Sequence, residues 1–174
     1  MWVENYSDFT QGTIVDGIDW GDELNPLSIV LSNACDLEHG HCSYILFAAL
    51  VDAKAVLTSS KEFQSSLNDG KISTKTAKKF FEKYIHNKEI GRYYFFDPSP
   101  VIDAGYLLVD FQRICSVKYN AETIDKLEKI GQLKHPFVEQ MMMRFVAYTS
   151  RIPSDRVDEN KVDEYVTNLS KNFI

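Results

Sequence analysis

Apolar and β-branched residues in the first third of the chain follow the pattern of buried strands. A short stretch at 13–15 precedes an acidic loop, and the run at 27–32 is apolar or β-branched almost throughout. A second apolar run covers 43–51. Such runs are typical of strands with little solvent exposure on either face. Because the segment between the two runs contains Gly40, we expect them to form a β-hairpin.

The spacing of apolar residues becomes helical in the middle of the chain. Residues 53–67 are expected to form one helix. Ser73 or Thr74 can cap a second one, in which apolar side chains recur every three or four positions. Those side chains are Ala77, Phe80, Phe81, Tyr84 and Ile85. We expect Phe80, Phe81 and Tyr84 to be largely buried, and Lys75, Lys79 and Lys83 on another face of the helix to be exposed.

Strand-like sequence returns after this helical segment. We expect a strand over 91–96, and over 106–117 either a strand pair or one bent strand. Helical spacing then resumes and predicts three helices: residues 121–130, a helix that begins near Pro136 and runs up to Pro153, and a last helix from Asp158.

These elements predict an α+β protein. We expect a β-barrel domain at residues 1–120, with a helical insertion at about 53–90. Residues 121–174 are expected to form a C-terminal helical extension that caps the barrel. The length of 174 residues suits one domain with an appended helical segment.

The composition excludes several classes of protein. Hydrophobic residues make up 44% of the chain, which is too many for a disordered protein. No apolar run reaches the ~18 residues of a membrane-spanning helix, so no membrane partner is expected. The N-terminus shows no secretory signal, and three cysteines do not suggest a disulfide framework. Together these observations predict a cytoplasmic protein.

Charge is distributed unevenly around a net charge of −6. Residues 1–70 carry eleven acidic and two basic residues, whereas residues 71–92 carry seven basic and two acidic ones. An acidic protein is not expected to bind polyanions unspecifically, so only the basic segment is a candidate for nucleic-acid binding. A partner-docking surface or a merely solvated helix face is the alternative. The candidate residues are Lys75, Lys79, Lys83 and Arg92.

The densest group of reactive side chains lies within the expected hairpin connection. It comprises Cys35, Asp36, His39, His41 and Cys42. If His39 and Gly40 form a two-residue turn, Cys35 and Cys42 share one sheet face, about 7–8 Å apart. Cysteine and histidine are the ligands of tetrahedral zinc sites.

Three interpretations of this group remain open. Cys35, His39, His41 and Cys42 are the candidate ligands of a zinc ion. Alternatively, the imidazole of His39 or His41 activates the Cys35 thiol while Asp36 or Glu38 orients that imidazole. We favour the third interpretation, in which Cys35 packs and Asp36 fixes the turn, because triad residues normally converge from separate elements. No cofactor is therefore expected, with zinc as the alternative.

Three stretches of the chain resemble the PemK/MazF family of toxin endoribonucleases. Residues 12–15 and 26–32 are similar to that family's opening Gly-Asp-Ile and Arg-Pro-x-Val-Val-Leu-Ser strands. Residues 104–114 are similar to the strand pair that leads to its closing helix. The resemblance implies a compact SH3-like β-barrel, often a homodimer, that binds single-stranded RNA.

The chain departs from this family at the catalytic positions. The family's arginine immediately precedes the strand proline, where this chain has Asn25, and its threonine ends the next strand, where this chain has Ala-Ala-Leu-Val at 48–51. Asparagine supplies no positive charge to a phosphoryl transition state, so the fold is implied without the ribonuclease chemistry. The stretch Ser-Asn-Ala-Cys-Asp at 32–36 resembles a Ser-x-x-Cys-Asp signature of uncharacterised bacterial and phage-encoded proteins.

Three functions follow as expectations. The first is a diverged, non-catalytic barrel module that binds a macromolecular partner in a bacterial or phage conflict system, such as toxin–antitoxin or phage defence. The second is an endoribonuclease that uses Lys75, Lys79 or Arg92 in place of the absent arginine. The third is a small zinc-binding or thiol-dependent protein centred on Cys35.

Overall fold

A computed structural model describes residues 3–5, 8–21, 26–87, 91–99 and 101–150. Within them, seven strands form one antiparallel sheet in the order β1-β7-β2-β3-β4-β6-β5. The strands are β1 (Val3–Glu4), β2 (Thr13–Asp16), β3 (Ser28–Val30), β4 (Tyr44–Asp52), β5 (Tyr93–Phe96), β6 (Leu107–Lys118) and β7 (Glu128–Leu133). The helices are α1 (Ala34–Glu38), α2 (Ala53–Ser59), α3 (Lys61–Ser65), α4 (Thr74–Ile85), α5 (Ala121–Ile124) and α6 (Phe137–Thr149).

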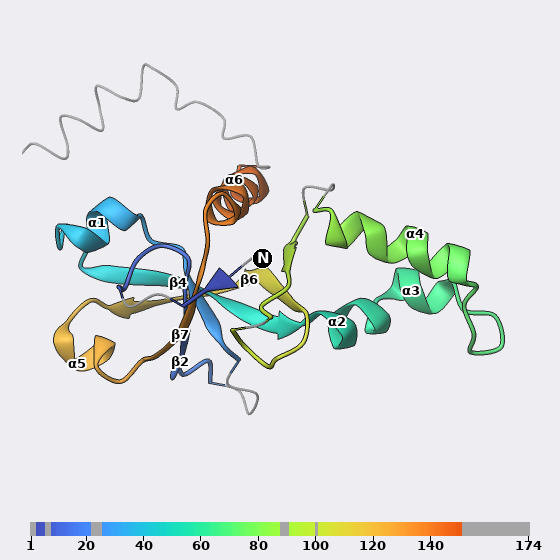
Figure 1. Cartoon of the computed structure of the whole chain (residues 1–174), viewed down its shortest axis with the longest axis horizontal. Helices are drawn as coiled ribbons and strands as arrows, with labels where there is room; N and C mark the ends of the chain where they lie inside the picture. Colours follow the sequence, from blue (N-terminus) through green and yellow to red (C-terminus); the bar gives the residue numbers. More distant parts are fainter. Residues whose placement is uncertain (1–2, 6–7, 22–25, 88–90, 100, 151–174) are drawn as a thin grey trace, which may run out of the picture.

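The sheet is curled into a half-barrel, which confirms the α+β class (Figure 1). Its largest irregularity lies between β4 and β6, where Ala48 pairs with Ile114 but Ala49 pairs with Asp110. Residues 111–113 therefore have no partners in β4. Bulges of this kind bend a strand and increase its twist. The sequence 106–117, expected to be a strand pair or one bent strand, is accordingly a single strand with a bulge.

Helix α6 covers one face of the sheet (Figure 1). Side chains alternate along β3, so that Ile29 and Leu31 contribute to the core beneath α6 and Val30 contributes to a core on the other face. The entry to β2 lies close to this helix, because a Cβ on Gly12 would come within 2.7 Å of the Val138 side chain. Gly12 also has φ +82°, a conformation that favours glycine. The helix expected near Pro136 is confirmed.

The helical insertion forms a separate arm rather than a continuous helix. The helix expected over 53–67 is divided at Ser60, whose hydroxyl accepts a hydrogen bond from Phe63 N and caps α3. Helix α4 begins as expected, with Ser73 as its N-cap. The arm packs on the sheet face opposite α6 through one cluster of buried residues: Ala53, Leu57, Phe80, Phe95 and Leu108.

The expected two-residue turn at His39 and Gly40 is wrong. Strands β3 and β4 do pair as neighbours, but α1 occupies their connection. Asn33 accepts a hydrogen bond from Cys35 N at 2.9 Å, and this N-cap favours a helical turn. The strand pairing that would place Cys35 and Cys42 on one sheet face is therefore absent from this connection.

The helix expected over 121–130 is also wrong beyond its first turn. Helix α5 ends at Ile124, and β7 lies between β1 and β2. Gln132 is buried there and accepts a hydrogen bond from the Thr13 hydroxyl at 2.8 Å. Pairing on both sides thus overrides the local helical spacing. The last helix expected, from Asp158, lies outside the described residues.

Candidate docking site on the helical arm

The helical arm, residues 53–87, projects from the sheet as α2, α3 and α4 (Figure 1). It carries seven lysines and three acidic residues, a net charge of +4. The rest of the chain carries twelve basic and twenty-two acidic residues, a net charge of −10. The helical arm therefore has a net positive charge, whereas the rest of this acidic protein has a net negative one.

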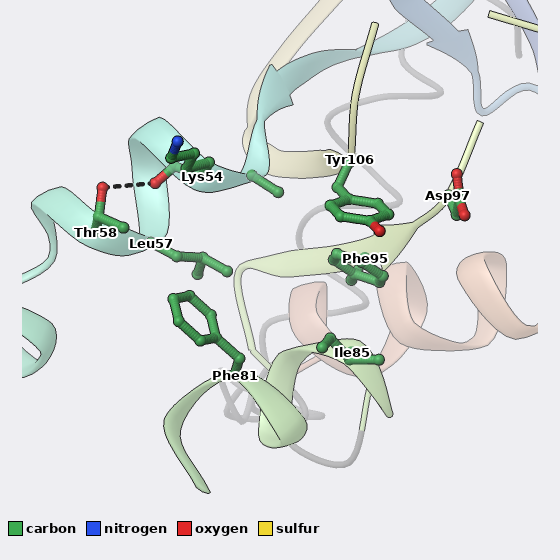
Figure 2. A pocket seen from close by; sticks show the side chains of 9 residues that line it. Lys54, Leu57, Thr58, Phe81, Ile85, Phe95, Asp97 and Tyr106 are labelled. Atoms are coloured by element: carbon green, nitrogen blue, oxygen red, sulfur yellow. Dashed lines mark hydrogen bonds between the residues drawn. The ribbon is translucent and has the colours of Figure 1, made fainter. Parts of the chain in front are cut away.

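An apolar pocket lies where the helical arm meets the sheet (Figure 2). Its volume is about 590 Å³, within the range of ~300–1,000 Å³ that is usual for ligand sites. Helix α2 contributes Leu57, α4 contributes Phe81 and Ile85, and β5 contributes Phe95. Phe81 and Ile85 are four residues apart, so both lie on one face of α4.

Tyr106 closes the side of the pocket that faces β6 (Figure 2). Its ring centroid lies 5.7 Å from that of Phe95, with the two rings tilted toward each other. The backbone carbonyl of Tyr106 accepts a hydrogen bond from Ala53 N at 3.0 Å, which fixes the start of α2 beside it. The pocket is thus built from four separate parts of the chain: α2, α4, the end of β5 and the residue before β6.

Few polar groups border the apolar pocket. The Thr58 hydroxyl donates to the Lys54 carbonyl at 2.7 Å and is therefore already occupied. Asp97 accepts hydrogen bonds from the backbone N–H and the hydroxyl of Ser99. Figure 2 shows Lys54 and Asp97 on opposite sides of the pocket. The lining therefore favours an apolar group on the ligand. One border of the pocket is cationic, at Lys54, and the opposite border is anionic, at Asp97.

The predicted basic face of α4 is exposed at Lys75 and Lys79. Neither lysine forms an ion pair with any residue that the structure describes. Lys78, three residues before Phe81, is also exposed and pairs with Glu82 at 3.7 Å. An exposed pair of this kind contributes little to stability, so Lys78 is available to a partner.

Lys83 does not belong to this exposed face, and its prediction as an exposed residue is wrong. Its ammonium group forms an ion pair with Glu62 of α3. The Nζ atom also lies 5.1 Å from the ring centroid of Phe80 and 4.9 Å from that of Tyr84. Lys83 thus holds α3 against α4. Phe80 is buried as predicted, whereas Phe81 and Tyr84 are half-buried.

Arg92 is held by the sheet. Its guanidinium forms a two-pronged ion pair with Asp110, with Nε 2.6 Å from Oδ1. The Asp110 side chain is only 1% exposed and also accepts a hydrogen bond from Gln112 N inside the bulge of β6. Hydrogen bonding to Asp110 raises the pKa of Arg92. This geometry indicates a structural role at the bend of the sheet.

The cysteine and histidine group lies on α1 and the turn after it. Cys35 is exposed and Cys42 half-buried, with Cys42 Sγ 3.8 Å from the carbonyl oxygen of Asp36. The rings of His39 and His41 lie 5.5 Å apart. No group of three or more metal-ligating side chains comes together in the part of the chain that the structure describes.

Among the described residues, no imidazole is hydrogen-bonded to a thiol. The contacts of the described residues include no hydrogen bond from Cys35 or Cys42 to His39 or His41. Cys115, on β6 opposite Phe47, is half-buried, and desolvation raises the pKa of its thiol. A raised pKa disfavours the thiolate, so Cys115 is poorly suited to act as a nucleophile.

Sequence reasoning found Lys75 and Lys79 but missed the apolar pocket, Lys54 on its border, and the exposed Lys78 on α4. The helical spacing of α4 did indicate that Phe81 and Ile85 share a face. Nothing local indicated that Phe95 and Tyr106 complete the pocket.

None of the helices in the described part of the chain is long and apolar enough to cross a membrane. A comparison with protein-family models found no match, and a comparison with curated proteins found none either.

Proposed function

We propose that this chain is a non-catalytic binding module that docks an acidic protein partner on its helical arm. The observation that carries the proposal is the separation of charge between the helical arm, at +4, and the rest of the chain, at −10. Lys75 and Lys79 are exposed and make no ion pair within the described residues. Charge complementarity of this kind steers partners and selects among them.

A protein partner is better supported than single-stranded RNA. Proteins that bind single strands combine cationic grooves with aromatic surfaces that stack on bases, and base edges require hydrogen-bonding partners. The apolar pocket, which Lys54 borders, offers few polar groups, and Asp97 on its other side would repel a phosphate. Residues 48–50, which stand where the PemK/MazF family has its threonine, are buried and carry no hydroxyl. This supports a binding role over an endoribonuclease.

An SH3-like, PemK/MazF-type barrel is part of the same proposal. The consecutive antiparallel strands β2, β3 and β4 and the curl of the sheet support the SH3-like, PemK/MazF-type resemblance. That resemblance and the Ser-x-x-Cys-Asp stretch at 32–36 support a place in a bacterial or phage conflict system. We also propose a homodimer, because the family that the chain resembles is often dimeric. Light scattering of the full chain tests this oligomeric state.

The test measures binding of two labelled probes by fluorescence anisotropy: a glutamate-rich peptide and a single-stranded RNA oligomer. We expect the peptide to bind and its affinity to fall as salt is raised, because exposed charges are screened. The double variant Lys75→Glu/Lys79→Glu should weaken peptide binding by about tenfold or more. The matched control is Lys118→Glu/Lys126→Glu, which changes the net charge by the same amount outside the helical arm.

Two results would contradict the proposal. If the control variant weakens peptide binding as much as the arm variant does, the effect is one of net charge and not of the helical arm. If the RNA binds more tightly than the peptide and is cleaved, the endoribonuclease alternative replaces the binding module.

A further inference from the structure

The apolar pocket opens to solvent between side chains that are themselves exposed. Ile85 on its α4 border is 42% exposed and Tyr106 on its sheet border is 59% exposed. Leu57 and Phe95, deeper in the pocket, are buried. Exposed apolar side chains that surround a concave apolar surface are typical of an interaction site.

From this geometry we propose that the apolar pocket receives one bulky apolar side chain, aromatic or large aliphatic, from an acidic segment of the partner protein. This inference rests on the proposed function, because it specifies which chemical group of the acidic partner binds at the helical arm. Interfaces draw most of their binding energy from a few buried anchors, and aromatic side chains are enriched among those anchors.

Charge at the border of the apolar pocket sets the direction of the bound segment. Lys54 on α2 lines the pocket on the side of the helical arm. Lys78, which is exposed, lies three residues before Phe81 on α4. Asp97 lies on the other side (Figure 2). The acidic residues of the partner therefore extend from the anchor toward the helical arm and away from Asp97.

The lining also selects an apolar side chain over a nucleobase. A base brings several donors and acceptors that need partners once they leave water. The Thr58 hydroxyl and the Asp97 carboxylate already have hydrogen-bonding partners within the chain. An aromatic or aliphatic side chain brings no such requirement and fits against Leu57, Phe81 and Phe95.

The experiment compares two glutamate-rich peptides, one with a single tryptophan and one with alanine in its place. We expect the tryptophan peptide to bind the full chain about tenfold more tightly or better, because a large apolar surface leaves water. Ile85→Ser should abolish this difference between the peptides. The matched control Val146→Ser, which changes a similarly exposed apolar residue on α6, should leave it intact. Lys75→Glu/Lys79→Glu should weaken both peptides alike.

The outcomes separate the two proposals. If neither peptide binds, the proposed function fails and this inference with it. If both peptides bind equally and Ile85→Ser changes nothing, the pocket inference alone is overturned.

Two further measurements distinguish other occupants of the apolar pocket. If light scattering shows that the full chain is a dimer and that the Ile85→Ser variant is a monomer, the pocket belongs to a second copy of the chain. A peptide of residues 158–174 that displaces the tryptophan peptide would assign it to the chain's own end. Either result would overturn the inference.

Discussion

The sheet and the helical arm are built on different principles. The sheet holds its residues between two cores, one beneath α6 and one on the opposite face, and strands far apart in sequence meet in it. The helical arm is made of consecutive helices that pack on the sheet through one small cluster. The sheet therefore supplies most of the stability of the molecule, whereas the helical arm supplies net positive charge, exposed surface and most of the lining of the apolar pocket.

The largest expected effect tests the sheet. Phe47 on β4 is fully buried in the core on the face opposite α6. Phe47→Ala should lower the free energy of unfolding by about 3–5 kcal/mol, because it removes buried apolar surface and leaves a cavity. Urea denaturation followed by circular dichroism measures this change. A loss below about 1 kcal/mol would show that the core near Phe47 is not the main source of stability.

A smaller and more local effect is expected in the helical arm. Phe80, only 6% exposed, is the buried residue of α4. Phe80→Ala should weaken the local packing by about 3 kcal/mol, which lowers the amide-exchange protection of α4 by about two orders of magnitude. The amides of β4 and β6 should keep their protection. If they exchange faster as well, the helical arm and the sheet unfold as one cooperative unit.

The smallest effect concerns cysteine reactivity, since all three cysteines lie outside the helical arm. At pH 8 a thiol reagent should modify exposed Cys35 first and Cys115 most slowly. Desolvation raises the pKa of Cys115 above its usual value near 9, so its reactivity should still increase as the pH rises beyond 9. Phe80→Ala should not change the Cys115 rate, whereas Phe47→Ala should increase it, because Phe47 pairs with Cys115.

Mass spectrometry of the labelled protein over time identifies each site. Equal rates for Cys35 and Cys115 would contradict the burial of Cys115. A faster Cys115 in the Phe80→Ala variant would show that disruption of the helical arm spreads into the sheet.

The sequence predicted those helices and strands whose formation depends mainly on their own residues. The apolar spacing and the cap at Ser73 suffice for α4, and the aromatic run of β5 suffices for a strand. In contrast, β7 contains charged residues and Gly131, and it is a strand because β1 and β2 pair with it. Helix α1 depends on the cap at Asn33, which competes with a tight hairpin turn.

The same distinction applies to the candidate site. Exposed lysines spaced four apart, such as Lys75 and Lys79, are readable from sequence alone. Lys83 was misplaced because its partner, Glu62, lies in another helix. The apolar pocket was not predictable, because Leu57, Phe81 and Tyr106 meet only after the helical arm has folded back onto the sheet.

The attachment of the helical arm at both its ends has a consequence for how this chain can diverge. Ala53 N donates to the Tyr106 carbonyl at one end, and at the other the Asn87 side chain donates to the Phe95 carbonyl and accepts from Phe95 N. Once such a loop is closed, each doubling of its length costs only about 0.6 kcal/mol of entropy. Insertions in the exposed connection between α3 and α4, residues 68–71, therefore cost little for folding, so the helical arm can change in length there while the sheet stays the same.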